Sequence, residues 1–234
     1  MRSWDEDEMI VIGLTGGIAS GKSLVARELA KLPGFTAVEI DKLAWEVYRP
    51  GSEVYKRLID RFGPQILRED GEIDRRRLGE IVFNDPEELR FLDEAVHPEV
   101  TARLRGLIEA ERRRGTRVLI LEAALLLESP HVDRSLFDYI LALRVGREER
   151  LRRLQERDGL TREEAELRLG AQDPERLEEA DYIIDASGTP EETVVRAREL
   201  ILSLCSCPAK AEARARGGEI VAPGGDLEEG PGVI

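Results

Sequence analysis

The feature that most constrains this chain is a glycine-rich stretch at residues 16–23, which reads Gly-Gly-Ile-Ala-Ser-Gly-Lys-Ser. A glycine, four residues and then Gly-Lys-Ser is the pattern of a phosphate-binding loop. Residues 9–14 before it form a short apolar run typical of a buried strand, and residues 22–32 after it carry apolar side chains at helical spacing. Strand, glycine loop and helix in this order predict an α/β fold that binds a nucleoside triphosphate.

Each part of this loop has a task in holding phosphates. Glycines let the backbone turn tightly and direct successive N–H groups at phosphate oxygens, and the following helix N-terminus adds partial positive charge. We expect the Lys22 ammonium to reach the β- and γ-phosphates and the Ser23 hydroxyl to join the shell of a Mg²⁺ ion. The expected nucleotide-binding residues are Gly17, Ile18, Ala19, Ser20, Gly21, Lys22, Ser23 and Leu24.

Length and charge narrow the class of protein. A chain of 234 residues with 41% hydrophobic residues suits one α/β domain with insertions. The net charge of −13 argues against a general nucleic-acid surface. No apolar run approaches the ~20 residues of a membrane span, and the N-terminus lacks signal-peptide character. We expect a cytoplasmic protein in which Cys205 and Cys207 are reduced thiols.

Further strands are predicted at residues 35–41, 117–122, 138–143 and 181–185. Asp41 and Glu122 stand at the carboxyl ends of the first two of these, where open α/β sheets bind ligands. Asp41 is a candidate base or metal-shell carboxylate, although an Asp in this position can equally cap the next helix. Glu122 is a candidate for holding a water molecule on Mg²⁺.

The segment between these two strands, residues 42–115, is helical in pattern and too long for a simple crossover. One helix is predicted to begin at Asp85-Pro86, and a second over Val100 to Ile108. We expect a helical subdomain that covers a second substrate. His97 lies between the two helices, and a lone histidine is more often a structural hydrogen-bonding group than a site residue.

A strongly basic helix follows the strand at 138–143, and Arg150, Arg153 and Arg157 share one of its faces. Glutamates are interleaved with these arginines, so one interpretation is a solvated helix crossed by salt bridges. The other is a lid that delivers an arginine to a transferring phosphoryl group. Both interpretations stay open on the residues alone.

The motifs taken together resemble the dephospho-CoA kinase family from about residue 9 to residue 204. The resemblance is carried by the phosphate loop and by Asp41-Lys42-Leu43-Ala44, Pro50-Gly51-Ser52, Asp74-Arg75, His97-Pro98, Arg157-Asp158-Gly159-Leu160 and Gln172. It implies one kinase domain at 9–205, with a phosphate-loop fold whose parallel five-stranded sheet is flanked by helices. It also implies a helical acceptor-binding insertion at 42–115 and a lid at 146–175.

The resemblance further implies the reaction. ATP with Mg²⁺ would be the phosphoryl donor, and the ribose 3′-hydroxyl of dephospho-CoA, a small-molecule acceptor, would take the phosphate. Asp41 matches the family's general base, with Lys22 and Arg157 neutralising charge. His97 becomes a candidate for the acceptor site beside its structural role, and Glu122 a further candidate there. A monomer is compatible with the sequence.

Several positions depart from the family's usual pattern. Where the family usually has Asp-Ala-Asp the chain has Glu39-Ile40-Asp41, and where it has Asp-x-Pro the chain has Glu122-Ala123-Ala124. Leu24 replaces a common Thr, and Ala186 replaces a common Asn. These changes bear on the contacts of the acceptor and of the adenine, not on the class of reaction.

Three other functions compete with this one. Another small-metabolite kinase, acting on a nucleoside or nucleotide, would share the loop and differ in the insertion. A GTP switch needs an Asn-Lys-x-Asp loop, which is excluded because Asp85 follows Asn84, the sole asparagine. An inactive nucleotide-binding scaffold is disfavoured because Lys22, Ser23, Asp41 and Arg157 are all intact. Residues 1–8 and 206–234 are expected to be a disordered extension and a disordered tail.

Overall fold

The computed structural model describes residues 9–82, 84–124, 126–127, 132–170 and 174–206. The predicted extension at 1–8 and the predicted tail, apart from Ser206, lie outside the described residues, as do Gln172 and Cys207. Cys205 is described and carries a free thiol.

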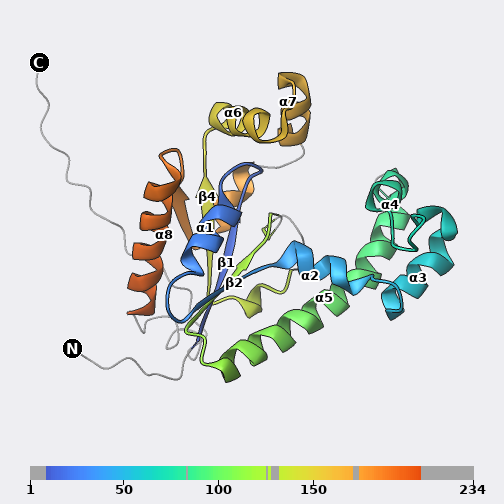
Figure 1. Cartoon of the computed structure of the whole chain (residues 1–234), viewed down its shortest axis with the longest axis horizontal. Coiled ribbons are helices and arrows are strands. Elements are labelled where there is room, and N and C mark those ends of the chain that lie inside the picture. The colour runs from blue at the N-terminus through green and yellow to red at the C-terminus, as the bar shows by residue number, and fades with distance from the viewer. Residues whose placement is uncertain (1–8, 83, 125, 128–131, 171–173, 207–234) are drawn as a thin grey trace, which may run out of the picture.

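A five-stranded parallel sheet with the strand order β2-β3-β1-β4-β5 forms the centre of the molecule (Figure 1). The strands are β1 (Ile10–Gly16), β2 (Phe35–Glu39), β3 (Val118–Glu122), β4 (Tyr139–Arg144) and β5 (Tyr182–Asp185). Because β1 is central, the loop that follows it opens between the ends of β3 and β4. The predicted parallel five-stranded α/β fold is confirmed.

Both faces of the sheet are buried, as the continuous apolar runs predict. Val11 and Leu119 point to one face, which the long helix α5 (Pro86–Arg114) covers, and Ile12 and Ile120 point to the other. Helices α1 (Lys22–Leu29) and α8 (Pro190–Cys205) cover that second face (Figure 1). The chain thus forms a helix–sheet–helix sandwich with the glycine loop at one edge.

The boundaries of α1 and β2 differ from the predicted ones. The first helix ends at Leu29 and not at Leu32, because Pro33 has no N–H to donate to the Leu29 carbonyl and its ring crowds that carbonyl, which accepts from the Leu32 N–H instead. The second strand ends at Glu39, and α2 (Ile40–Val47) starts at once, so that Asp41 lies in the first helical turn. The alternative role of Asp41 as a cap is therefore wrong, since Glu39 holds the cap position.

The predicted helical insertion is present as α2, α3 (Glu53–Phe62), α4 (Arg75–Val82) and α5. Figure 1 shows α3 and α4 at the end of α5 that lies away from the sheet. The prediction of two helices around His97 is wrong, because α5 runs through Pro98 as one helix of 29 residues. Apolar residues on both sides of Pro98 pack into one core cluster, which offsets the hydrogen bond that the proline removes.

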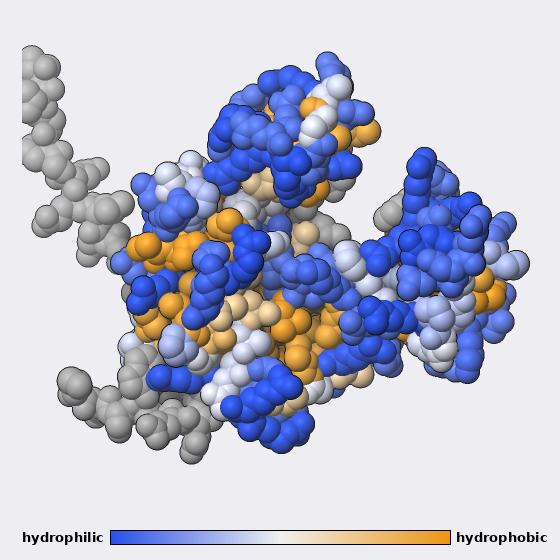
Figure 2. Space-filling view, in the orientation of Figure 1, coloured by the Kyte–Doolittle hydropathy of each residue, from blue (hydrophilic) through white to orange (hydrophobic). Residues whose placement is uncertain are grey.

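Helices α6 (Arg147–Asp158) and α7 (Arg162–Gly170) form a second projection, at the edge where the glycine loop lies (Figure 1). Its surface is mainly hydrophilic in Figure 2. The interleaved charges form the expected salt bridges, with Arg152 bound to both Glu149 and Glu156. Short 3₁₀ turns occur at Pro64–Ile66, Arg134–Leu136 and Pro174–Glu179. Among the described residues, no helix is long and apolar enough to cross a membrane.

Candidate active site

The glycine loop turns sharply at positions where only a glycine fits well. Gly16 has a φ of 147°, and a Cβ atom there would lie 2.7 Å from the Leu143 carbonyl oxygen. Gly21 has a φ of 96° and precedes α1 without a side-chain cap. The first-turn N–H groups of α1 therefore face the loop as hydrogen-bond donors for an anion. The backbone has the shape that the phosphate-loop motif predicts.

Lys22 places its ammonium at the start of this loop. Its Nζ atom donates hydrogen bonds to the carbonyl oxygens of Gly16 at 2.9 Å and Gly17 at 3.3 Å, and the residue is buried. Burial lowers the pKa of the ammonium, whereas the negative charges of Glu122 and Asp41 act in the opposite direction. Both predicted carboxylates are thus close enough to Lys22 to act on it.

Glu122 and Ser23 meet beside the loop. The Ser23 hydroxyl donates to Glu122 Oε2 at 3.2 Å, and Glu122 lies at the end of β3, opposite Leu14 of β1 in the strand register. Burial of the carboxylate raises its pKa, and the charge of Lys22 partly offsets this rise. The two residues predicted near the metal are therefore brought together.

Asp41 extends from the first turn of α2 toward the same cluster. Its carboxylate accepts a backbone hydrogen bond from Ala124, and desolvation by the surrounding protein raises its pKa even though the residue is exposed at the pocket mouth. The Lys22 ammonium acts against this rise. Asp41, Lys22 and Glu122 accordingly form one electrostatic group.

A pocket of about 390 Å³ opens from Asp41 toward the helical insertion. It is lined by Asp41, Ala44, Trp45, Tyr48, Leu78, Leu92, Asp93, Val96, His97 and Ala124. His97 Nε2 lies 3.3 Å from Asp93 Oδ1, one helical turn earlier on α5. The predicted base and the predicted acceptor-site histidine therefore line the same pocket, beside the phosphate loop.

Sequence reasoning missed the aromatic residues of this pocket. Trp45 and Tyr48 follow Asp41 at helical i+4 and i+7 spacing, which is the signal that could have found them. The guanidinium of Arg75, from α4, lies 3.7 Å from the centre of the Trp45 ring. This contact joins α4 to α2 and places a positive charge next to the pocket.

The Arg157 side chain, the predicted lid cation, is placed differently from that of Lys22, which bonds to the phosphate loop. Helix α6 does belong to the cluster that meets the loop: its Leu151 and Leu154 form a buried cluster with residues of α7, and Ile18 and Ala19 pack against that cluster. The Arg157 side chain, however, is 60% exposed and binds Asp158 at 2.7 Å. The structure brings α6 to the loop and directs this arginine to its chain neighbour.

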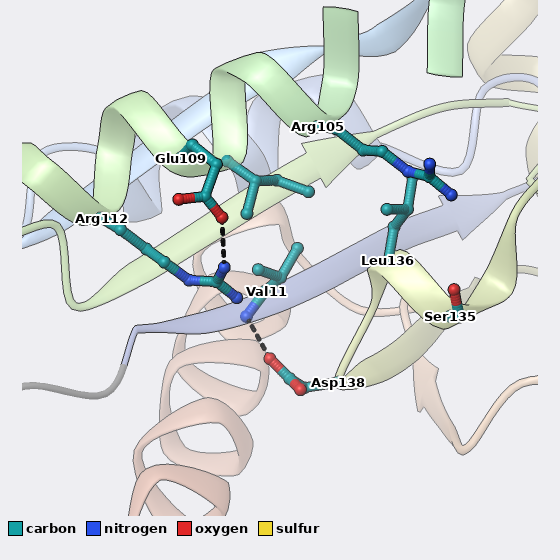
Figure 3. A pocket seen from close by; sticks show the side chains of 8 residues that line it. Val11, Arg105, Glu109, Arg112, Ser135, Leu136 and Asp138 are labelled. Atoms are coloured by element: carbon teal, nitrogen blue, oxygen red, sulfur yellow. Dashed lines mark hydrogen bonds and ion pairs between the residues drawn. The ribbon is translucent and has the colours of Figure 1, made fainter. Parts of the chain in front are cut away.

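A second cavity, of about 350 Å³, lies between α5 and the starts of β1 and β4 (Figure 3). Its arginines are already paired, Arg112 with Glu109 at 2.7 Å and Arg105 with Asp133 at 2.8 Å. The cavity is at the amino ends of parallel strands, opposite the edge where such sheets bind ligands. We therefore do not include it in the active site.

Comparison with known proteins agrees with this geometry. The dephospho-CoA kinase family model matches residues 10–192. Dephospho-CoA kinase of Carboxydothermus hydrogenoformans is 44% identical over 196 residues, covering 83% of this chain and 92% of that protein. Dephospho-CoA kinase of Geobacillus kaustophilus is 45% identical over 186 residues, covering 79% and 91%.

Solved structures support the same assignment. A crystal structure of a Thermus thermophilus protein is 35% identical with a TM-score of 0.69, covering 84% of this chain and 97% of that one. Dephospho-CoA kinase from Campylobacter jejuni is 26% identical with a TM-score of 0.61, at 84% and 97% coverage. The chain is a kinase and belongs to the dephospho-CoA kinase family.

Proposed function

We propose that this chain, acting in the cytoplasm, transfers the γ-phosphoryl group of ATP to the ribose 3′-hydroxyl of dephospho-CoA, giving coenzyme A and ADP. The observation that carries the proposal is the position of Asp41, which lines the pocket of the helical insertion and is electrostatically coupled to Lys22 of the phosphate loop. A group in this position can touch an acceptor in the pocket while the donor phosphates lie on the loop. Family membership supplies the identity of the acceptor.

Asp41 is the proposed general base. A ribose hydroxyl is a poor nucleophile, and a carboxylate bonded to it both orients it and accepts its proton. The hydroxyl oxygen forms a bond to the γ-phosphorus, the bond to the bridging oxygen breaks, and its electron pair leaves with ADP. Because desolvation raises the pKa of Asp41, the carboxylate is a stronger proton acceptor than a free aspartate.

The remaining residues act by charge and position. The N–H groups of the loop and of α1 bind phosphate oxygens, and Lys22 Nζ exchanges its loop carbonyls for the β- and γ-phosphates. In the acceptor pocket, His97 is held by Asp93 and is positioned to orient the acceptor. Arg157 contributes its charge if the lid movement separates it from Asp158.

The oxygen ligands near the loop suit Mg²⁺. Ser23 offers a hydroxyl and Glu122 a carboxylate 3.2 Å from it, and Mg²⁺ is commonly held by one or two such side chains together with nucleotide phosphates. When bound, the ion neutralises charge on the β- and γ-phosphates. Glu122 would act on it directly or through water.

The test is ADP release from ATP and Mg²⁺ with dephospho-CoA, adenosine, AMP or water as the acceptor. A signal confined to dephospho-CoA, with coenzyme A as the product by mass, is the expected result. Phosphorylation of adenosine or AMP instead would favour another small-metabolite kinase. Tight ATP binding without transfer to any of the acceptors would favour an inactive nucleotide-binding protein.

A further inference from the structure

We propose that Arg150, in the first turn of α6, is a second cation for the terminal phosphate of the donor nucleotide, beside Lys22. This role rests on the proposed function only in requiring a nucleoside triphosphate as donor. Arg150 would be a catalytic residue that touches the transferring phosphoryl group. The sequence motif instead indicates Arg157 for this role.

Strand pairing brings the start of α6 to the phosphate loop. Leu143 of β4 is the register partner of Gly16, the last residue of β1. Only Val145 and Gly146 separate β4 from α6, and the Arg150 N–H donates to the Gly146 carbonyl at 3.1 Å. Arg150 therefore lies one helical turn beyond a strand whose end is hydrogen-bonded beside the loop.

Packing fixes the side of α6 that meets the loop. Leu151, the next residue, is 1% exposed and belongs to the cluster that packs against Ile18 and Ala19 of the loop. Arg150 itself is only 8% exposed, whereas Arg147, on the same first turns, is exposed. Burial of Arg150 beside the loop means that little water screens its charge from groups bound there.

Electrostatics supports the same location. The charge of Arg150 lowers the pKa of the Lys22 ammonium, and its effect is larger than that of Arg157. Holding two buried cations near one another is unfavourable, and a polyphosphate bound between them relieves that repulsion. The pair is suited to an anion with several charges.

The expected chemistry is stabilisation of charge at the γ-phosphate. As the acceptor oxygen bonds to phosphorus and the bridging oxygen departs with ADP, negative charge spreads over the transferring oxygens and the leaving oxygen. The planar guanidinium of Arg150 can donate paired hydrogen bonds to these oxygens, while Asp41 takes the hydroxyl proton. Arg150 itself forms and breaks no covalent bond.

The experiment compares nucleotide affinities in the full-length protein. A non-hydrolysable ATP analogue and ADP, each with Mg²⁺ and without acceptor, are titrated by calorimetry into wild type, Arg150→Gln and Arg150→Lys. Arg147→Gln is the matched control, because it removes an exposed arginine from the same helix. We expect Arg150→Gln to weaken binding of the ATP analogue about ten-fold or more and that of ADP less than about three-fold. Arg150→Lys keeps the charge and recovers part of the loss, and Arg147→Gln changes neither affinity.

Equal weakening of both nucleotides, or no change in either, overturns the proposal, because a merely structural arginine cannot distinguish the terminal phosphate. If Arg150→Gln does not fold, the ratio of the two affinities in Arg150→Lys decides in the same way. The binding test uses no acceptor, so a selective loss of the ATP analogue supports Arg150 even if dephospho-CoA proves not to be the substrate.

Discussion

Asp41 combines two properties at the scale of a single residue: it lines the pocket in which we propose that the acceptor binds, and desolvation raises its pKa. A raised pKa means that the carboxylate becomes protonated at a higher pH than a free aspartate. If Asp41 accepts the proton of the acceptor, kcat falls as the pH drops through this raised value. We therefore expect Asp41 to contribute to the acid side of the pH–rate profile.

We predict that Asp41→Asn lowers kcat by roughly 10²–10⁴-fold, the usual contribution of a general base. The affinity for ATP should change little, since the phosphates are held by the loop. The residual rate should depend less on pH over the acid range than that of wild type, measured as kcat from pH 4 to pH 8, because Asp41 no longer titrates. If Asp41→Asn turns over at a rate close to that of wild type, Asp41 is not the general base.

Two loop glycines, Gly16 and Gly21, allow the cost of a steric clash to be compared with the cost of a positive φ alone. At Gly16 a Cβ atom would lie 2.7 Å from the Leu143 carbonyl oxygen and 2.8 Å from Ser20 Oγ, whereas at Gly21 it would meet nothing within 4 Å. We expect Gly21→Ala to reduce the free energy of unfolding by about 1–2 kcal/mol, from its positive φ alone. Gly16→Ala should cost more, because it adds a clash with backbone. Equal losses in urea unfolding would contradict this difference.

Local patterns could predict some site residues and not others. Lys22, Ser23 and the loop glycines are consecutive in the chain, so one motif predicted their common location. Arg150 was placed on a basic face but not singled out, because its burial depends on the pairing of β4 with β1 and on the packing of α6. A sequence pattern contains neither contact.

At the scale of elements, α6 connects two loops at the same edge of the sheet. It packs on the phosphate loop, and Arg153 donates hydrogen bonds to the carbonyl oxygens of Ala186 at 3.0 Å and Gly188 at 3.3 Å in the loop between β5 and α8. Ala186, which replaces a common asparagine, is buried there. The position of that loop therefore depends on a side chain of α6.

We predict that Arg153→Ala speeds amide hydrogen exchange in residues 186–189, because the carbonyls lose their cross-element donor and the loop opens more often. Arg152→Ala is the control, since Arg152 bonds only within α6, to Glu149 and Glu156, in the described structure. Exchange followed by mass spectrometry should be faster in the first variant alone. Equal exchange rates for residues 186–189 in the two variants would mean that Arg153 does not stabilise this loop.

The predicted helix boundary within α5 was wrong for a physical reason. A proline inside a helix normally ends or bends it, and that local rule favoured a boundary at His97-Pro98. Ala95 and Val100, on either side, are both buried in one core cluster, so tertiary packing holds a single helix. Helical periodicity predicted that the segment is helical but could not weigh this packing against the proline.

The same proline provides a test. We predict that Pro98→Ala raises the free energy of unfolding by roughly 1–3 kcal/mol, because the missing hydrogen bond is restored and the ring clash is relieved. The KM for the acceptor should rise as well, since restoring the hydrogen bond shifts the backbone at His97, which lines the pocket. Glu99→Ala, an exposed change on the next residue, should alter neither quantity much. Unchanged stability in Pro98→Ala would show that the helix is already relaxed.

On the scale of the whole molecule, α6 and α7 project above the end of the sheet that carries the glycine loop, and α3 and α4 project to one side at the far end of α5 (Figure 1). In the proposed function, the loop and α6 would contact the donor, and the pocket lined by α2 and α5 would hold the acceptor. Between them the fold gathers Lys22, Asp41 and Glu122, and desolvation shifts the pKa of each toward its neutral form. In the folded chain without ligand, the ionised forms of these three side chains therefore reduce the free energy of unfolding.

This cost predicts a dependence of stability on pH. The folded-state pKa of Glu122 is raised, so protonated Glu122 is favoured by folding, and that stabilisation is lost as the pH rises through the folded pKa. Glu122→Gln, which resembles the protonated acid, should therefore be more stable than wild type near neutral pH. The difference should shrink toward zero below about pH 4, where the carboxyl group is protonated in both states.

Chemical unfolding of both proteins from pH 4 to pH 8, with kcat measured in parallel, is the check. We expect Glu122→Gln to gain stability and to lose activity, because the same charge that opposes folding would help to hold Mg²⁺ against Ser23. Saturating MgATP should then narrow the gap in melting temperature, since wild type gains RT ln(1 + [L]/Kd) with the smaller Kd. If Glu122→Gln is instead less stable at neutral pH, the carboxylate is a structural partner of Ser23, and its buried charge is offset within the protein alone.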